Sequence, residues 1–193
     1  MLVSLNVDGT IIMFLISLYF DDKTDLRMRF MMEQIAKRTG NDAMIRGNVP
    51  PHITLSAFFI SEGEAAKAVD IFDAYVEDLR DSQMRMGEIT WCSVGAFLPH
   101  TIYLAPVLNE YLHELADKAY VQVGNTEKIR VHKRYRPFGW FPHSTMAKHL
   151  TPEEMKIAFS VLQKQFKMFE GRAVSVGLAQ TNPYRDICTY SLK

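Results

Sequence analysis

The sequence has few of the features that mark several large classes of protein. Its two cysteines, Cys92 and Cys188, lie far apart and outside any CxxC spacing. This argues against a disulfide framework or a zinc ribbon and favours two buried free thiols. The apolar run 11–20 is too short to span a bilayer. We therefore expect a soluble, cytoplasmic protein that does not cross a membrane.

An excess of charge of one sign is also lacking. The 22 Lys and Arg residues balance the 22 Asp and Glu residues, so the formal net charge is zero. This balance argues against bulk attraction to nucleic acid. Low-complexity segments and a flexible Pro/Gly/Ser linker are missing too, while 48% of the 193 residues are hydrophobic. We expect one domain over 1–193, built from two pseudo-symmetric lobes at roughly 1–99 and 100–193.

The common cofactor and nucleophile motifs are missing. The chain has no Walker loop, no GxGxxG and no GxSxG elbow. His113 and Glu114 begin an HExxH-like string, but Asp117 stands where the second histidine would be. Glu110 and His113 form only a single ExxH copy, whereas di-iron bundles need two. We therefore expect neither a metal nor a cofactor.

A repeated pentapeptide is the most informative feature that is present. Pro51-His52-Ile53-Thr54-Leu55 recurs 91 positions later (143 minus 52) as Pro142-His143-Ser144-Thr145-Met146. In an extended strand, side chains at i and i+2 leave by the same face, so each unit would present an imidazole beside a hydroxyl. Two such units facing each other could surround one phosphate.

The sequence after each motif is also repeated. Ser61 with Glu64 and Thr151 with Glu154 both match a capping box at the start of a helix. Counted from these caps, apolar residues recur at offsets 4, 7, 8, 11 and 15, with Val69 and Phe159 both at offset 8. The spacing predicts matching amphipathic helices, each following a motif strand.

The remaining elements can be placed around this repeat. A strand at 13–20 precedes a helix from Thr24 to about Gly40, which is expected to bury Leu26, Phe30, Met31 and Ile35. Further strands are predicted at 52–60, 84–98, 101–107, near His143, and in a hairpin at 173–180 and 186–192; further helices are predicted at 61–80, over 108–119 and at 151–169. The pattern indicates an α+β fold.

A basic and aromatic segment leads into the second motif. Five cations fall within nine residues: Lys128, Arg130, Lys133, Arg134 and Arg136. Cations beside aromatics suit a phosphodiester backbone with bases to stack upon. A solvated basic edge is equally consistent with the pattern. We expect the neighbouring Phe138 and Phe141 to lie in the core, because aromatic residues are usually buried.

Paired histidines suit acid and base catalysis. An unperturbed histidine titrates near 6.5, so one neutral and one protonated imidazole can coexist near neutral pH. One ring would take a proton from the attacking group and the other would give one to the leaving alkoxide. The threonines would donate to the non-bridging phosphate oxygens, where charge accumulates. A single His-x-Thr unit would more simply be an imidazole bonded at a strand edge.

Together, His52-Ile53-Thr54-Leu55 and His143-Ser144-Thr145-Met146 resemble the paired signature of the two-histidine phosphoesterase superfamily, which includes 2′-5′ RNA ligase-like proteins and cyclic phosphodiesterases. The resemblance implies a bilobal α+β fold in which each lobe has an antiparallel sheet and the active cleft lies between them. It implies that His52 and His143 are the acid and base and that Thr54 and Thr145 bind phosphate. Looser candidates for substrate contact are Arg46, Arg134, Arg136, Lys148 and Tyr184.

The resemblance implies metal-independent hydrolysis of 2′,3′-cyclic phosphates, with a nucleotide or an RNA terminus as substrate. Two alternatives stay open at this point. A 2′-5′ RNA ligase would use the same residues in the reverse direction, and a nucleotide or RNA-end binding module would keep the cleft without the reaction. The residues do not distinguish which histidine is the base, which phosphate isomer is the product, or the oligomeric state.

Overall fold

A computed structural model of the protein describes residues 10–193. The eight strands are β1 (Ile11–Phe20), β2 (Ile53–Ser61), β3 (Gly87–Phe97), β4 (Thr101–Pro106), β5 (Arg130–Val131), β6 (Ser144–Ala147), β7 (Phe169–Gln180) and β8 (Arg185–Ser191). The helices are α1 (Asp22–Thr39), α2 (Ala43–Arg46), α3 (Lys67–Asp81), α4 (Glu110–Gly124) and α5 (Pro152–Gln165), with 3₁₀ turns η1 (Glu62–Glu64) and η2 (Lys133–Tyr135).

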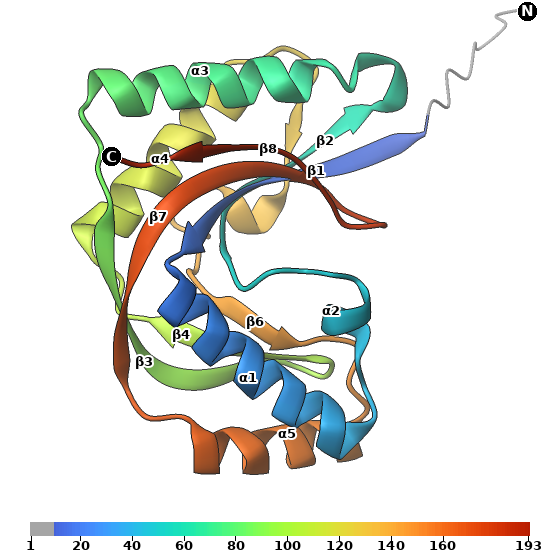
Figure 1. Ribbon diagram of the computed structural model, residues 1–193. Coiled ribbons are helices and arrows are strands. Elements are labelled where there is room, and N and C mark those ends of the chain that lie inside the picture. Colours follow the sequence, from blue (N-terminus) through green and yellow to red (C-terminus); the bar gives the residue numbers. More distant parts are fainter. Residues whose placement is uncertain (1–9) are drawn as a thin grey trace, which may run out of the picture.

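All the strands belong to one antiparallel sheet. Their order is β5-β2-β1-β7-β3-β4-β6, and β8 also pairs with β7. Strand β7 is the link, since residues Phe169–Ala173 pair with β3 and residues Ala173–Gln180 pair with β1. Figure 1 shows β7 curving strongly between the two parts of the sheet. The α+β class with antiparallel pairing is confirmed, and the expected two sheets are continuous through β7.

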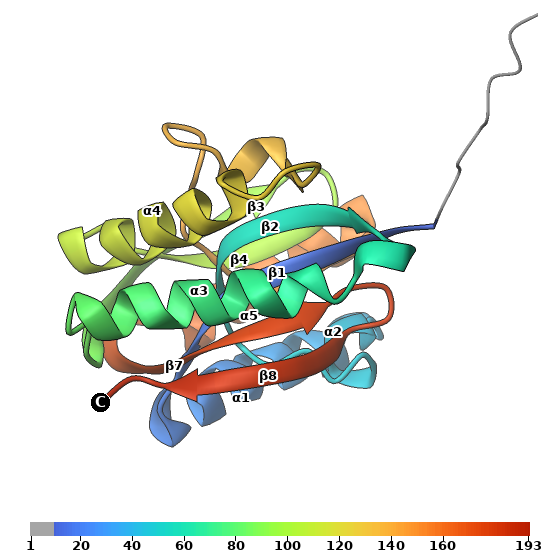
Figure 2. The same ribbon diagram turned by 90° about the horizontal axis from the view of Figure 1, so that it is seen from above.

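The four longer helices, α1, α3, α4 and α5, form two pairs at opposite ends of the molecule. Helix α3 packs beside α4, and α1 packs beside α5 (Figures 1 and 2). Each pair combines one helix from the first half of the sequence with one from the second. The two sequence repeats therefore interleave in space. Within residues 10–193, no helix is long and apolar enough to cross a membrane.

Helix α1 differs from the prediction in its buried face. It begins at Asp22, because the Asp21 side chain accepts a hydrogen bond from the Thr24 backbone N–H at 2.8 Å, and it ends at Gly40 with φ of 78°. The expectation that Leu26 and Phe30 are buried is wrong, since they are 66% and 50% exposed. The core stripe consists of Met28, Met31, Met32 and Ile35. The helix buries Met28 and Met32, which lie two positions after Leu26 and Phe30, and this shift turns Leu26 and Phe30 outward.

Only the second of the two predicted capping boxes forms. Thr151 accepts from the Glu154 backbone N–H at 3.2 Å, and Glu154 accepts from the Thr151 backbone N–H at 2.7 Å. The Ser61 side chain makes no bond to a backbone N–H, because the chain first forms η1 and α3 begins only at Lys67. Ser61 instead donates to the Glu64 carboxylate at 3.2 Å. The predicted start of α3 is therefore wrong.

The repeat between α3 and α5 is confirmed at offsets 7 and 11, where Ala68, Ala158, Phe72 and Leu162 are buried, but it is wrong at offset 8. Val69 and Phe159 are exposed, whereas Ile71 and Val161 are buried, both at offset 10 (71 minus 61 and 161 minus 151). The other end of α5 also differs, since the helix stops at Gln165 and Phe169 begins β7. There the Phe169 ring stacks on the buried indole of Trp91 at 4.9 Å between centroids.

Both cysteines are free, as expected, but their predicted burial is wrong for Cys92. Cys92 is exposed and Cys188 is half-buried. Cys92 lies on β3 next to Trp91, which is fully buried. The register against β4 changes from Trp91–Pro106 to Ser93–Ala105, so Cys92 is the extra residue of a bulge and its thiol is not buried beside the indole.

Candidate active site

The two motif histidines have the same local geometry. His52 directly precedes β2 and His143 directly precedes β6. The Nδ1 atom of His52 lies 2.8 Å from the Pro50 carbonyl oxygen, and that of His143 lies 2.9 Å from the Phe141 carbonyl oxygen. A carbonyl oxygen only accepts, so each Nδ1 carries a proton and each Nε2 stays free for proton transfer. The two rings are thus oriented by the same contact, to a residue two positions upstream.

A shared irregularity follows each motif threonine. In β2 the register against β1 changes from Ile16–Ser56 to Ser17–Thr54, which leaves Leu55 as an extra residue. In β6 the register against β4 changes from Ile102–Ala147 to Tyr103–Thr145, which leaves Met146 as an extra residue. Such bulges re-aim the side chains on either side of them.

The bulge determines which residues share a face with the motif. Leu15 pairs with Ala57, and Ser17, two residues along the same strand, pairs with Thr54. Paired residues share a face, so Thr54 faces the same side as Ala57 although the two are three residues apart. Without the extra residue they would face opposite sides. In the second motif, Lys148 likewise lies three residues after Thr145, with the extra residue Met146 between them, so it faces the same side as Thr145.

Burial and neighbouring charges lower the pKa of both motif histidines. Burial is the main cause that lowers the pKa of His52 below 6.5, and the positive charges of His143 and Lys148 lower it further. The Pro50 carbonyl and the Asp186 carboxylate act in the opposite direction on this pKa. Burial also lowers the pKa of His143, and the Arg134 charge adds to that effect. The influence of His143 on His52 means that the two motifs share one electrostatic environment.

A cavity of about 650 Å³, which we call the inner cavity, contains the second motif. Its lining includes His143, Thr145, Lys148 and Arg134, with Met13, Leu15 and Ala57 from the β1–β2 side. Three aromatic rings surround the His143 imidazole: Phe97 at 4.8 Å, Tyr103 at 5.5 Å and Phe141 at 6.4 Å between ring centroids. The Arg134 guanidinium lies 5.6 Å from the Phe97 ring centroid. The cavity therefore offers cations and aromatic faces beside one motif histidine.

Two tyrosines and a carboxylate lie beside the first motif. The Tyr19 ring is 6.4 Å from the His52 ring. The Tyr19 and Tyr184 hydroxyl oxygens are 3.0 Å apart, and Tyr184 donates to the Asp186 carboxylate at 2.6 Å. Burial raises the pKa of Tyr19 to about 12. Sequence reasoning singled out Tyr184 but missed Tyr19 and Asp186, because both come from strands whose pairing brings them to His52.

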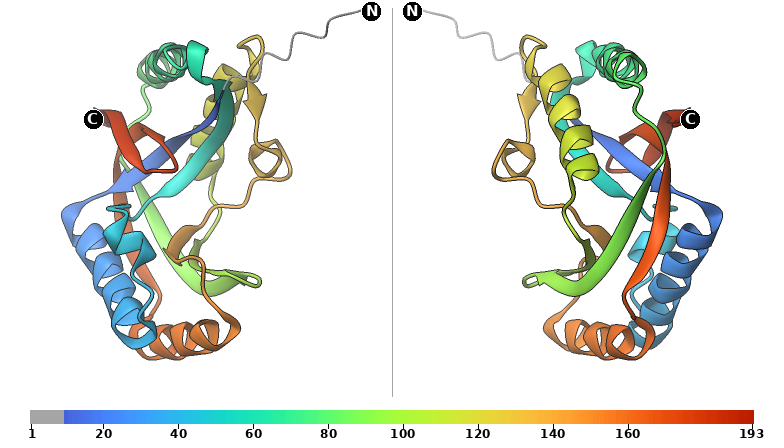
Figure 3. Two further views of the ribbon diagram at one scale, coloured as in Figure 1. Left: turned by 90° about the vertical axis from the view of Figure 1, so that its right-hand side faces the viewer. Right: turned by 90° about the vertical axis from the view of Figure 1, so that its left-hand side faces the viewer.

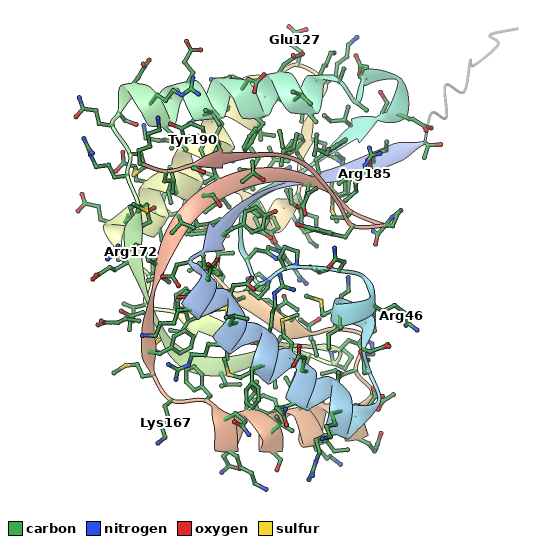
Figure 4. The ribbon with its side chains drawn as sticks, in the orientation of Figure 1. Arg46, Glu127, Lys167, Arg172, Arg185 and Tyr190 are labelled. Atoms are coloured by element: carbon green, nitrogen blue, oxygen red, sulfur yellow. The ribbon has the colours of Figure 1, made fainter. Side chains whose placement is uncertain are left out.

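The looser candidates fall in different places. Arg134 and Lys148 line the inner cavity, and Tyr184 belongs to the cluster beside His52. The Arg46 side chain is 76% exposed and extends away from the body of the protein (Figure 4). Its guanidinium lies 3.4 Å from the carboxylate of Asp42, the N-cap residue of α2. Arg136 lines a different cavity. The structure does not bring Arg46 and Arg136 into the inner cavity.

That different cavity, which we call the outer cavity, measures about 270 Å³ and lies between α4 and the segment 135–140. Its lining includes Leu55, His113, Tyr120, Tyr135 and Arg136. Figure 3 shows the chain around η2 standing at the side of the molecule.

The segment 132–141 is attached to the first motif. The Trp140 indole N–H donates to the Thr54 carbonyl oxygen at 3.0 Å. Burial raises the pKa of Tyr135, which a hydrogen bond with the Thr54 side chain partly offsets. The prediction that Phe138 and Phe141 are core residues is wrong, since Phe138 is fully exposed and Phe141 is 47% exposed. Trp140 contacts the first motif here, Phe138 is left exposed, and the half-exposed Phe141 lines the inner cavity.

Other hollows and clusters contain no motif residue. The groove along the outer side of α5, about 670 Å³, is lined by Val94, Phe159 and Phe166 among others. Across residues 10–193, no three His, Cys, Asp or Glu side chains are grouped so that they could hold a metal ion. His113 and Asp117, from the HExxH-like string, pair with each other at 3.0 Å.

Comparisons with known proteins show the family and the fold of the chain. Residues 23–184 match the 2′-5′ RNA ligase superfamily. No curated protein sequence matches the chain. The structure is similar to that of Escherichia coli LigT complexed with 3′-AMP, with a TM-score of 0.59 and 11% identity, over 95% of this chain and 99% of that one.

Two further solved structures have the same fold. The protein TT0787 of Thermus thermophilus has a TM-score of 0.58 and 12% identity, over 93% of this chain and 97% of that one. The PDE domain of MHV ns2 has a TM-score of 0.51 and 14% identity, over 94% and 98%. At these identities the likeness establishes the fold, and the family match over 23–184 establishes membership. The chain belongs to the 2′-5′ RNA ligase superfamily.

Proposed function

We propose that the protein is a metal-independent phosphoesterase that hydrolyses 2′,3′-cyclic phosphates of nucleotides or RNA ends. The observation that supports this most strongly is the pair of imidazoles with Nδ1 bonded to a backbone carbonyl and Nε2 free. Two free Nε2 atoms, with the charge of His143 acting on the protonation of His52, are what a paired acid and base require. Thr54 and Thr145 then bind the non-bridging oxygens.

The reaction needs only water as co-reactant. The basic Nε2 takes a proton from water while the water oxygen forms a bond to phosphorus. The bond between phosphorus and one ribose oxygen breaks, and the acidic Nε2 gives its proton to that oxygen. Charge grows on the non-bridging oxygens in the transition state, where the threonine hydroxyls, Lys148 and Arg134 can stabilise it. The two rings end with exchanged protonation states, and release of the phosphomonoester allows them to reset.

The charges around the two rings favour one assignment of roles. Asp186 stabilises the protonated form of His52, whereas Arg134 disfavours a proton on His143. We therefore assign His52 as the general acid and His143 as the general base. Burial and the positive charges of His143 and Lys148 oppose a proton on His52. When His143 is neutral, as a base must be, its charge is removed, and Asp186 then has a larger effect on the His52 pKa than Lys148 has.

The similar structures also support a nucleotide substrate. One LigT structure contains 3′-AMP and others contain ATP or NADP⁺, while the MHV ns2 structure is described as a PDE domain. The inner cavity here has the cations and aromatic faces that such ligands need. In this chain, the nucleotide would place its phosphate between the motifs.

A panel of phosphodiesters assayed with chelator present tests the proposal. We expect the protein to open nucleoside 2′,3′-cyclic phosphates, to keep that activity in the chelator, and to lose it by about 10² to 10⁴-fold in His52→Ala and in His143→Ala. Near wild-type activity in either variant would refute the assignment. Product regiochemistry identifies which ribose oxygen leaves.

Ligation is the second candidate, because the matched superfamily is named for it. The same acid and base would join a 2′,3′-cyclic phosphate end to an RNA hydroxyl end in the reverse direction. Incubating cleaved tRNA halves with the protein and looking for a joined product distinguishes the two activities. A non-catalytic binding module would show neither reaction, and a bell-shaped pH profile of hydrolysis would exclude it.

A further inference from the structure

The inner and outer cavities are neighbours that share one side chain. Tyr135 lines both of them, and Trp140, which also lines the outer cavity, donates from its indole N–H to the Thr54 carbonyl oxygen of the first motif at 3.0 Å. Leu55, the extra residue after Thr54, lines the outer cavity. A ligand long enough to pass Tyr135 would therefore lie in both cavities at once.

Cations lie on both sides of this shared tyrosine. Arg134 lines the inner cavity and Arg136 lines the outer one. Lys133 precedes them in η2 and belongs to the same basic segment. In an otherwise neutral protein, this arrangement suits a phosphate that connects a group in one cavity to a group in the other.

An aromatic ring is held out beside the outer cavity. Phe138 is fully exposed, its backbone has a φ of 62°, and it is one of the residues that border the outer cavity. Residues with side chains rarely adopt this left-handed conformation, and such strain is often found at functional sites. An exposed aromatic face beside cations is suited to stacking against a base.

The opposite wall of the outer cavity is polar. It comes from α4 and presents His113, Asp117 and Tyr120, of which His113 and Asp117 are paired at 3.0 Å. These groups can donate and accept hydrogen bonds at a base edge. The exposed Leu108 adds an apolar surface at the start of this wall.

We propose that the outer cavity binds the nucleotide that precedes the terminal cyclic phosphate of an RNA chain, so that the protein selects RNA ends over free cyclic mononucleotides. This inference rests on the proposed function of the inner cavity. A 2′,3′-cyclic phosphate occupies the 3′ end, so the chain can continue only through the 5′-phosphate of the terminal nucleotide. That phosphate would pass Tyr135 between Arg134 and Arg136, and the preceding base would stack on Phe138.

The test compares two substrates that differ only in length: adenosine 2′,3′-cyclic monophosphate and a tetraribonucleotide ending in adenosine 2′,3′-cyclic phosphate. We expect wild-type protein to have the higher kcat/KM on the tetranucleotide. Phe138→Ala and Arg136→Ala should each lower kcat/KM on the tetranucleotide by about tenfold, as for one lost stack or phosphate contact. On the mononucleotide, both variants should match wild type.

Matched controls are Phe30→Ala, which removes another exposed ring on α1, and Arg85→Ala, which removes another exposed cation. Neither should change the ratio between the two substrates. The inference is overturned if wild type treats both substrates alike, if Phe138→Ala lowers both equally, or if it changes neither. The last result would be expected of a surface that binds another protein.

Binding separates this inference from the proposed catalytic function. The probes are a labelled tetranucleotide with a 3′-phosphate and unlabelled 3′-AMP as competitor, measured by fluorescence anisotropy. If the protein hydrolyses nothing, the proposed function fails, yet tighter binding of the tetranucleotide that is lost in Phe138→Ala still supports the outer cavity. Equal affinity for wild type and Phe138→Ala rejects the outer cavity even if hydrolysis is observed.

Discussion

Ala57, in β2, and Lys148, directly after β6, occupy equivalent positions relative to the two motifs. Each follows its motif histidine by five residues (57 minus 52 and 148 minus 143), each lies beyond the extra residue of its strand, and both line the inner cavity. The first repeat thus offers a methyl group where the second offers an ammonium group. The two motif segments are therefore alike in their backbone irregularity but differ in charge at this position.

Lys148 provides the first prediction. Lys148→Met should lower kcat/KM on a cyclic nucleotide by about 10- to 100-fold, because a charged contact to phosphate is lost. Lys148 also lowers the pKa of His52, so its removal raises that pKa. If His52 is the acid, the alkaline limb of the kcat/KM profile moves to higher pH. Lys156→Met, on α5, is the matched control, and an unmoved alkaline limb would contradict the role of His52.

Asp186 predicts the opposite shift. Its carboxylate raises the pKa of His52, so Asp186→Asn should lower that pKa. The acid then loses its proton sooner as the pH rises, and the alkaline limb moves to lower pH. The acidic limb, which belongs to His143, should stay in place. A shift of the acidic limb alone would mean that the roles of the two histidines are reversed. The control is Asp42→Asn, which changes an exposed carboxylate beside Arg46 and should shift neither limb of the profile.

Stability should also depend on the histidine pKa values. The pKa of His143 in the folded protein lies below 6.5, the ordinary value that the unfolded chain keeps. Between the folded pKa and 6.5, the unfolded chain therefore binds more protons than the folded protein. The stability associated with the neutral ring is present above pH 6.5 and is lost as the pH falls below it. His143→Gln removes this titration. In urea melts, the loss of unfolding free energy from pH 7 to pH 5 should be smaller in the variant than in wild type. An equal loss would show that His143 is not its source.

The two capping sites give a matched pair of stability predictions. Thr151→Ala should lower the free energy of unfolding by about 1 kcal/mol, because the helix loses a hydrogen bond to the Glu154 backbone N–H. Ser61→Ala should cost clearly less, because Ser61 bonds only to the Glu64 carboxylate, next to Lys67. Chemical denaturation of both variants measures the difference. Equal losses would show that Ser61 caps its helix in solution.

Local patterns predicted the elements well where one side chain decides the outcome. The cap at Thr151, the stop at Gly40 and the β1 strand follow from short sequence signals and are found in the structure. The start of α3 does not follow from them, because Ser61 with Glu64 fits a capping box equally well in sequence. The chain there forms a 3₁₀ turn before the helix, which the local signal does not encode.

The site was only partly predictable for a different reason. The repeated motif identified His52 and His143, but the extra residues Leu55 and Met146 depend on pairing with distant strands. Tyr19 and Asp186 reach His52 only through the curved sheet and the β7–β8 hairpin, so nothing near the motif announces them. The assumption that aromatic residues are buried also failed at Phe138, which is exposed, while Trp140 two residues later bonds to the first motif.

The proposed reaction requires two imidazoles from distant parts of the chain to act on one anion. Proton–nitrogen NMR of the histidine rings during a titration with inorganic phosphate measures this requirement. We expect a proton on Nδ1 of both His52 and His143, and Nε2 signals of both rings that shift together with one dissociation constant. Shifts confined to one ring, or two rings that follow different dissociation constants, would contradict it.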